Sequence, residues 1–261
     1  MDLGISGKKA LVLSAGGGLG RAIALELARE GAILCLVDRN EKSLEETAQL
    51  ISTTGAFCKK FIWDLSKPKQ WEKGIADIVN QHGGVDILIN NSGGPKPGPA
   101  FGHELTEWRE AYESMVLPII GITDLLLPGM RERRWGRIIT STSSGVIAPI
   151  ANLALSNTTR TALLGWSKTL ARDIAKDGVT ANIVVPGRIA TRRTQFLDTS
   201  RAQREGKDVA TIEQESAATI PLGRYGKPEE YADVITFLAS ERASYITGSI
   251  IRVDGGLISS L

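Results

Sequence analysis

The sequence predicts a single α/β domain in which a doubly wound parallel sheet of about seven strands carries helices on both faces. Three observations lead to this fold class. The length of 261 residues suits one domain, short apolar runs alternate with longer segments of helical periodicity, and a glycine-rich turn joins the first apolar run to the first helical segment. No internal repeat, low-complexity tract or linker interrupts the sequence, so we expect residues 1–261 to form one unit.

The first half of the chain shows the alternation most clearly. Residues 8–14 (KKALVLS) predict a strand, and residues 18–31 predict a helix that Gly31 ends. The predicted elements that follow are a strand at 32–38, a helix at 41–53, a strand at 57–65, a helix at 71–84 and a strand at 85–93.

The second half continues the pattern with predicted strands at 136–145, 178–187 and 249–256 and a helix that opens at the segment SNTTR. Because parallel strands joined by helices need right-handed crossovers and cover on both faces, a doubly wound sheet accounts for this order. The most apolar stretch, MVLPIIGITDLLLPGM, is interrupted by Pro118 and Asp124 and falls short of the roughly 20 residues of a membrane span.

The composition argues against several classes of partner. The formal net charge is +2, and Lys and Arg are interleaved with Asp and Glu, unlike the basic stripe of a nucleic-acid-binding protein. Cys35 and Cys58 lie in predicted strands, where a buried thiol is the usual role, and the start of the chain lacks the apolar core of a secretory signal. We therefore expect a cytoplasmic protein. His82 and His103 stand apart from other ligand types, so no metal site is expected.

The first turn, SAGGGLG, brings four glycines between a strand and the start of a helix. In that context, glycines let backbone N–H groups approach a pyrophosphate at the positive end of the helix dipole. The alternative explanation of the glycines is a turn that merely needs positive φ. About twenty residues on, Asp38 ends the second predicted strand, where a carboxylate accepts hydrogen bonds from an adenosine ribose and favours NAD. Arg39 could instead hold the 2′-phosphate of NADP, and Asp38 could instead cap a helix.

Several motifs stand in an order that resembles the short-chain dehydrogenase/reductase family, in particular its 3-oxoacyl-carrier-protein reductases, and that implies a Rossmann-type fold. SAGGGLG stands in place of the family's usual TGxxxGxG, NNSG in place of NNAG, and PGRIAT and the closing ITGSIIRVDGG complete the set. The resemblance covers nearly the whole chain. It implies a cofactor site formed by Ser14, Gly16, Gly18, Leu19, Gly20, Asp38, Arg39, Asp64, Leu65, Asn90, Gly93, Pro186, Gly187, Ile189 and Thr191.

Within that resemblance, particular contacts are implied. Asp64 and Leu65 should contact the adenine, Asn90 and Gly93 should support the ribose, and Ile189 with Thr191 should hold the nicotinamide amide. A homotetramer is implied as well, because the helix after SNTTR carries more apolar surface than one sheet face needs and the family pairs this helix across a two-fold axis.

The catalytic positions depart from the family pattern. The family uses a Ser, a Tyr that donates the proton, a Lys that lowers the pKa of this Tyr, and an Asn in a water relay. Ser143 is present, thirteen residues before the Tyr position, but Ser156 stands at the Tyr position, Arg160 at the Lys position and Met115 at the Asn position. An aliphatic hydroxyl is a far weaker acid than a phenol with a pKa of about 10, and Arg is a poor proton shuttle.

Three functions remain open on this basis. The first is an NAD(P)-dependent oxidoreductase that interconverts a hydroxyl and a carbonyl with an altered proton route through Ser143, Arg160 and water. The second is a dinucleotide-binding protein without turnover. The third is lyase or isomerase chemistry in which Arg160 stabilises an oxyanion. A further alternative makes Ser156 a helix cap and Arg160 a solvated side chain.

The segment 188–226 is the long insertion in the second half, and we expect it to form a lid over the cleft. Arg188, Arg192 and Arg193 at its root could bind the carboxylate or phosphate of an anionic small-molecule substrate. The alternative is a solvated helix in which nearby Asp and Glu residues pair with these arginines.

Overall fold

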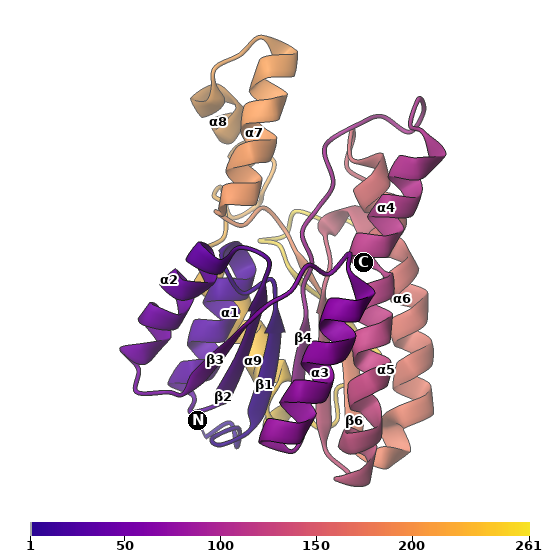
Figure 1. Cartoon of the computed structure of the whole chain (residues 1–261). Coiled ribbons are helices and arrows are strands. Elements are labelled where there is room, and N and C mark those ends of the chain that lie inside the picture. The colour runs from indigo at the N-terminus through magenta and orange to yellow at the C-terminus, as the bar shows by residue number, and fades with distance from the viewer. Residues whose placement is uncertain (1) are drawn as a thin grey trace.

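Seven parallel strands form one sheet in the order β3-β2-β1-β4-β5-β6-β7 in the computed structural model, which describes residues 2–261 (Figure 1). The strands are β1 (Lys9–Leu13), β2 (Ile33–Asp38), β3 (Cys58–Ile62), β4 (Ile87–Asn90), β5 (Gly136–Ser141), β6 (Val179–Pro186) and β7 (Ile250–Val253). The predicted fold class, a Rossmann-type doubly wound sheet, is confirmed.

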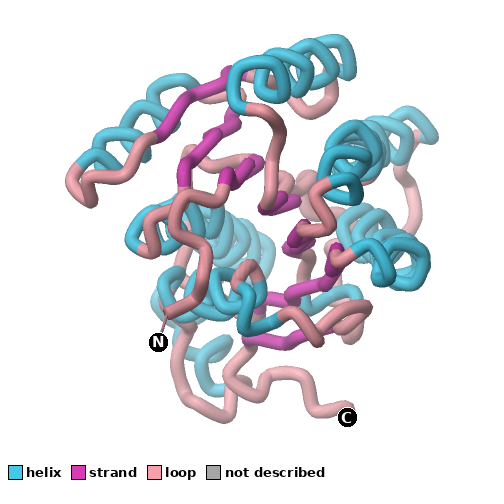
Figure 2. The backbone as a smooth tube through the Cα atoms, turned by 90° about the horizontal axis from the view of Figure 1, so that it is seen from below, coloured by secondary structure: helices cyan, strands magenta, loops and turns pink. Residues whose placement is uncertain are grey.

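Helices connect consecutive strands and cover both faces of the sheet, as the view along the molecule in Figure 2 shows. They are α1 (Gly18–Arg29), α2 (Glu41–Ser52), α3 (Pro68–His82), α4 (Leu105–Met115), α5 (Leu117–Glu132), α6 (Ala154–Ile174), α7 (Arg192–Glu205), α8 (Val209–Ala218) and α9 (Pro228–Leu238). Short 3₁₀ turns are η1 (Ser144–Val146), η2 (Ala175–Asp177) and η3 (Glu241–Ala243).

The strand residues divide between two apolar clusters, one on each face of the sheet. In β1, Ala10 and Val12 pack with α1, α2 and α9, whereas Leu11 and Leu13 pack with α3, α5 and α6. Every residue of β4, β5 and β6 is buried, as expected for parallel strands covered on both sides. The two-sided apolar runs of the sequence therefore fix the sheet rigidly beneath the loops at its edge.

The two cysteines differ in burial because their strands differ in position. Cys35 lies in β2 and is buried, and this burial raises the pKa of its thiol to about 11. Cys58 lies in β3, the edge strand, and is only half-buried, so the expectation of two buried thiols holds for Cys35 alone.

The α4 and α5 segment, Leu105–Glu132, is the one stretch of the described residues that is long and apolar enough to cross a membrane by length and composition. Of its most apolar window, 44% is buried inside the molecule, and buried residues of α5 belong to the same apolar cluster as α3 and α6. The backbone also breaks at Val116, just before Pro118, which divides the stretch into two helices. The packing is that of helices covering a sheet.

The elements lie where they were expected, but several strands end earlier than predicted: β4 ends at Asn90 rather than at residue 93, and β5 at Ser141 rather than at residue 145. The α3 helix begins at Pro68 rather than at residue 71, because proline suits the first turn of a helix. The α6 helix begins at Ala154, so Ser156 lies inside its first turn and does not cap it. Between β6 and α9, residues 188–226 contain two helices, α7 and α8, that project from the body beyond the ends of the strands (Figure 1).

Candidate functional site

The loops that follow β1, β2, β3, β4, β5 and β6 all leave the sheet at its carboxyl edge, where α7 and α8 also project (Figure 1). The strand order reverses between β1 and β4, so the connections from these neighbours leave in opposite directions, the arrangement at which doubly wound sheets form a crevice. In open α/β sheets ligands bind at this point. The predicted site residues lie in the loops around it.

The glycine turn between β1 and α1 has no room for side chains where its backbone is closest. A Cβ added to Gly20 would lie 2.1 Å from the Ser14 carbonyl oxygen, and Gly18 has φ of 53°, which favours glycine. Across residues 2–261, no side chain caps the N-terminus of α1, and the first turn of α1 contains no acidic residue. The N–H groups of this turn are therefore available to an anion.

Ser14 occupies a backbone conformation that serine rarely adopts, with φ of 52°. When the family pattern TGxxxGxG is placed so that its last glycine is Gly20, its first glycine falls on Ser14. The strained serine therefore stands where a glycine would be free of strain. The missing glycine at position 14 is visible in the sequence and could have predicted strain at this turn.

Asp38 at the end of β2 turns back onto the glycine turn. Its Oδ2 accepts a hydrogen bond from the Gly16 N–H at 2.9 Å, and its Oδ1 accepts one from the Asn40 N–H at 2.9 Å. The cap of α2 is Asn40, whose Oδ1 accepts from the Ser43 N–H, so the alternative of Asp38 as helix cap is wrong. A carboxylate has further lone pairs, so Asp38 can still accept from a ribose.

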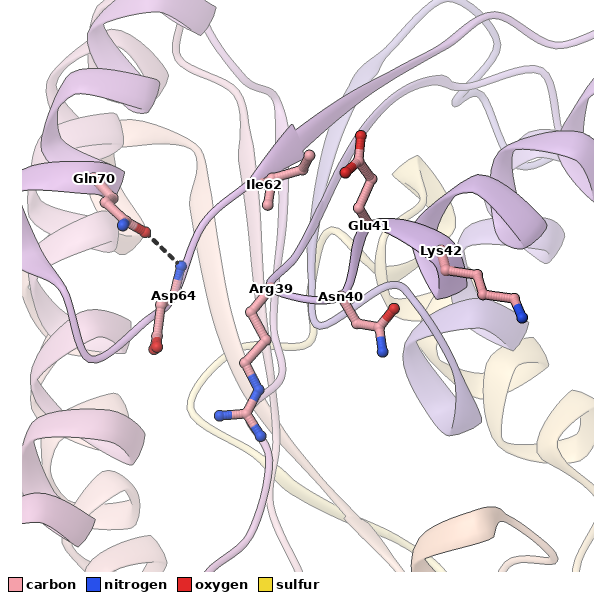
Figure 3. Close-up of a pocket in the computed structure, with 7 residues that line it drawn as sticks. All are labelled: Arg39, Asn40, Glu41, Lys42, Ile62, Asp64 and Gln70. Carbon is pink, nitrogen blue, oxygen red and sulfur yellow. Dashed lines mark hydrogen bonds between the residues drawn. The ribbon is translucent and has the colours of Figure 1, made fainter.

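A shallow hollow lies beside Asp38 and is shown in Figure 3. Arg39 reaches into it between Asp64 and Lys42, whereas Glu41 is turned the other way. The Ser66 hydroxyl donates to Asp64 Oδ1 at 2.7 Å, and the backbone N–H of Asp64 donates to Gln70 Oε1 at 2.8 Å. The residues that line the hollow are Arg39, Asn40, Glu41, Lys42, Ile62, Asp64 and Gln70.

Asn90 at the end of β4 lies beneath the cleft. Its side chain is fully buried, and its Nδ2 donates to Thr123 Oγ1 at 3.2 Å and to Thr140 Oγ1 at 3.4 Å. Gly93, three residues on, is exposed. Direct contact between a ribose and this asparagine side chain therefore requires a rearrangement, because the side chain instead ties β4 to α5 and β5.

Ser143 follows β5 at the same edge. Its side chain is half-buried and its Oγ accepts a hydrogen bond from the Gly145 N–H at 3.2 Å, which caps η1. The hydroxyl proton is not used in this contact, so it remains available as a donor.

Ser156 and Arg160 lie one turn apart on α6, and both are 7% exposed. Arg160 Nη2 donates to the Ser92 carbonyl at 3.1 Å and to the Gly93 carbonyl at 2.7 Å, both in the loop after β4. Burial lowers the pKa of Arg160 to about 10, and the nearby charge of Arg193 adds to this effect. The alternative in which Arg160 is a solvated side chain is therefore wrong.

Met115, at the position of the family's Asn, is 2% exposed in an apolar cluster with Val116, Ile119 and Leu163. Thr159 Oγ1 contacts its sulfur at 3.8 Å. A thioether in such surroundings cannot relay a proton.

The loop after β6 joins the cleft to the projecting helices. Gly187 lies so close to Asp254 that a Cβ would approach its Cα to 2.5 Å, and Ile189 pairs with Gly226 in a parallel bridge. Thr191 caps α7 by accepting from the Thr194 N–H at 3.3 Å, and a Cβ on Gly18 would lie 3.7 Å from its side chain. The glycine turn and the PGRIAT loop are therefore neighbours, as the resemblance implied.

The three arginines at the root of this segment have different surroundings. Arg188 pairs with buried Asp198 and with the Tyr225 hydroxyl, as the alternative of a salt-bridged helix expected. Arg192 is exposed. Arg193 is turned toward the body, and its Nη2 donates to the Pro95 carbonyl at 2.7 Å. The three arginines differ in which residues surround them in the folded chain, so the sequence alone could not assign them different roles.

Comparison with known proteins gives a consistent set of similarities. A family described as enoyl-(acyl carrier protein) reductase matches residues 14–258. The 3-oxoacyl-[acyl-carrier-protein] reductase FabG of Aquifex aeolicus is 34% identical, over 98% of this chain and 100% of its own length.

Solved structures match over the whole fold. L-Sorbose reductase from Gluconobacter frateurii, complexed with NADPH and L-sorbose, superposes with a TM-score of 0.94 at 34% identity, and the match covers 100% of both chains. YwfH, an NADPH-dependent reductase involved in bacilysin biosynthesis, gives a TM-score of 0.94 at 30% identity over 98% of this chain and 100% of its own.

Proposed function

Because the chain belongs to the short-chain dehydrogenase/reductase family, we propose that it is an NAD(P)-dependent oxidoreductase that interconverts a hydroxyl and a carbonyl group. The observation that carries this proposal is the cradle between β1 and α1. At Gly20 the turn packs so closely on Ser14 that a Cβ would collide with the Ser14 carbonyl, and among residues 2–261 no side chain caps the N–H groups at the start of α1. Such a cradle suits a pyrophosphate.

The other residues around the crevice fit the remainder of a dinucleotide. Asp38 would accept from the adenosine ribose, the hollow lined by Asp64 would receive the adenine side, and Ile189 with Thr191 would hold the nicotinamide amide. Gly93, Pro186 and Gly187 shape the backbone between these ends. When bound, the nicotinamide supplies the hydride to a carbonyl carbon or takes it from an alcohol.

We propose that NAD(H) binds more tightly than NADP(H). The hollow beside Asp38 is lined by two basic residues, Arg39 and Lys42, and by two acidic residues, Glu41 and Asp64. Asp38 adds a further carboxylate, so a 2′-phosphate meets little net positive charge. The sorbose reductase structure contains NADPH. The alternative for this chain is therefore tighter binding of NADP(H), in which Arg39 would hold the 2′-phosphate.

Reduction also needs a proton at the substrate oxygen, and this chain has no phenol at the usual position. We propose that Ser143 donates a hydrogen bond to that oxygen, that the Arg160 guanidinium stabilises negative charge on it, and that the proton is drawn from water. A pKa of about 10 keeps Arg160 charged at neutral pH, so its role is electrostatic. Ser156 would line the pocket without acting as the acid.

We also propose that residues 188–226 act as a lid. Both ends of the segment meet at the Ile189 and Gly226 bridge, where the Ala190 N–H donates to the Gly226 carbonyl at 2.8 Å. Arg201 of α7 joins the two helices through its ion pair with Glu215 of α8 at 2.8 Å, and it also pairs with Glu205 within α7 at 2.7 Å. A unit with its own contacts and a narrow root can move as one body.

The test of the function uses the wild-type protein in two steps. NADH and NADPH are titrated by fluorescence, and oxidation of the bound NADH is then followed with a panel of ketones, 3-oxo esters and oxo acids. We expect stoichiometric binding and oxidation by at least one class. Binding without oxidation by any class would favour a dinucleotide-binding protein without turnover, and no binding of either cofactor would overturn the proposal.

A further inference from the structure

Two guanidinium groups from different elements meet at the loop after β4. Arg160 of α6 donates to the carbonyls of Ser92 and Gly93, and Arg193 of α7 donates to the carbonyl of Pro95. A Cβ on Gly94 would lie 2.9 Å from Arg193 Nη2, so the missing side chain makes room for this guanidinium. Two positively charged groups therefore contact one short loop of four consecutive residues.

Neither charge is balanced by a carboxylate. Within residues 2–261, no Asp or Glu lies within ion-pair distance of Arg160 or Arg193, whereas Arg188, Arg201 and Arg224 each pair with one. Burial lowers the pKa of both unbalanced arginines, and the charge of Arg193 further lowers that of Arg160. Like charges partly shielded from water repel each other, and an anion between them would relieve this cost.

A third polar group at the same place lacks a partner. Ser92 is 7% exposed, and in the part of the chain that the structure describes its hydroxyl makes no hydrogen bond. Buried hydroxyls are ordinarily paired, so the unpaired Ser92 hydroxyl, in the loop that both arginines contact, can donate to a bound ligand. The family motif NNAG has an alanine at this position and therefore no hydroxyl. The hydroxyl is present here because this chain has NNSG.

We propose that Arg193 and Ser92 bind an oxyanion, a carboxylate or phosphate, that the substrate carries, and that the charge of Arg160, which acts at the reacting oxygen in the proposed function, adds to the attraction. This inference rests on the proposed function and names its substrate class as an anionic carbonyl compound or alcohol. Oxyanions accept several hydrogen bonds at once, and guanidinium groups are suited to donate them in pairs.

A phosphate of the cofactor is the competing occupant, because Thr191, two residues before Arg193, lies beside Gly18. The uncapped N–H groups of α1 already suit the pyrophosphate, and both arginines contact the loop on the β4 side of the crevice. We therefore assign the arginines to the substrate. The experiment distinguishes an oxyanion of the substrate from a phosphate of the cofactor.

The experiment measures the binding of malonate and of inorganic phosphate by calorimetry, with and without saturating NADH, at an ionic strength fixed with NaCl. The variants are Arg193→Met, which keeps an apolar stem, and Arg192→Met, the exposed neighbour on the same helix, as matched control. NADH affinity is measured for each variant, and circular dichroism verifies folding.

We expect at least one of the two anions to bind the NADH-loaded wild type. Arg193→Met should weaken that binding by about tenfold or more, since a lost hydrogen bond to a charged group costs about 1.5–3 kcal/mol. Arg192→Met should change it by less than about twofold, the size of a surface charge effect. NADH affinity should stay the same in both variants.

Two results would overturn the proposal: neither anion binds above the NaCl background, or NADH displaces the anion competitively, which would make this a cofactor phosphate site. A protein that binds malonate but not NADH would instead retain the anion site and lose the proposed oxidoreductase function. The two failures are thus distinguishable.

Discussion

Arg160 shows how one residue changes the chemistry of the cleft. A lysine at this position would present a compact ammonium that tunes a neighbouring phenol, whereas the guanidinium spans two carbonyls of the loop after β4. Arg160 thereby fixes that loop and leaves a buried positive charge at its end. Under the proposed function, Ser156 and Arg160 would replace a proton-donating pair with an electrostatic one.

Ser14 carries a prediction about stability at the residue scale. A left-handed conformation costs a non-glycine residue roughly 1–2 kcal/mol, part of which glycine offsets through its greater freedom when unfolded. Ser14→Gly should therefore raise the free energy of unfolding by up to about 1 kcal/mol, as urea denaturation would measure. Ser14→Ala keeps the strain and serves as control. A loss of stability in Ser14→Gly would show that the serine side chain matters more than its backbone.

Asp38 carries a prediction about cofactor choice. Asp38→Ser removes the carboxylate that repels a 2′-phosphate and leaves Arg39 and Lys42 beside it. The ratio of NADP(H) to NAD(H) affinity should therefore rise by about tenfold, the equivalent of about 1.4 kcal/mol. Fluorescence titration of both cofactors measures it. If the wild type already binds NADPH at least tenfold more tightly than NADH, the assignment to Asp38 is wrong and Arg39 dominates.

At the scale of elements, the apolar strands and helices were predictable and the lid helices were not. The strand at Lys9–Leu13 and the helix at Gly18–Arg29 follow from apolar periodicity and from Gly31. The α7 helix is largely polar, the apolar residues of α8 do not gather on one face, and an ion pair of Arg201 joins the two, so periodicity offers no signal for them. Sequence order likewise could not show that Arg193 reaches Pro95, which depends on how the two loops meet.

The turn that opens α1 yields a prediction about an element. Gly20→Ala would drive a methyl group to 2.1 Å from the Ser14 carbonyl, so the turn must shift and cofactor affinity should fall by about tenfold or more. Gly165→Ala in α6 is the matched control. A Cβ added to Gly165 would have no heavy atom within 4 Å apart from its chain neighbours and the helix's own backbone, so cofactor affinity should stay unchanged. Titration of NADH measures both. Unchanged affinity in Gly20→Ala would show that the cradle does not bind the cofactor.

At the scale of the whole molecule, the large apolar side chains of α6, where a contact between copies was expected, are buried or half-buried, whereas α4 and α5 expose several. Leu105 is 71% exposed, Leu117 49% and Leu125 46%, and Tyr245 and Leu261 are exposed near the chain's end. We predict a homo-oligomer, and a tetramer in particular, because two such surfaces allow two kinds of two-fold contact. Light scattering at micromolar concentration should return a mass well above the 28.0 kDa of one chain. A mass near 28.0 kDa would contradict the prediction.

Ser156 and Arg160 are proposed to occupy the catalytic locus of a working cofactor cleft. The most direct measurement is the steady-state reduction of ethyl acetoacetate with saturating NADH by the wild type, Ser156→Tyr, Arg160→Lys and the double variant. General acid catalysis typically supplies a factor of about 10² to 10⁴, and Met115 still interrupts the water relay, so the double variant should gain at least about tenfold over the wild type. Neither single variant should match it, because the phenol and its pKa-lowering neighbour act together. If no form turns over although NADH binds stoichiometrically to all four, the locus lies elsewhere and the claim fails.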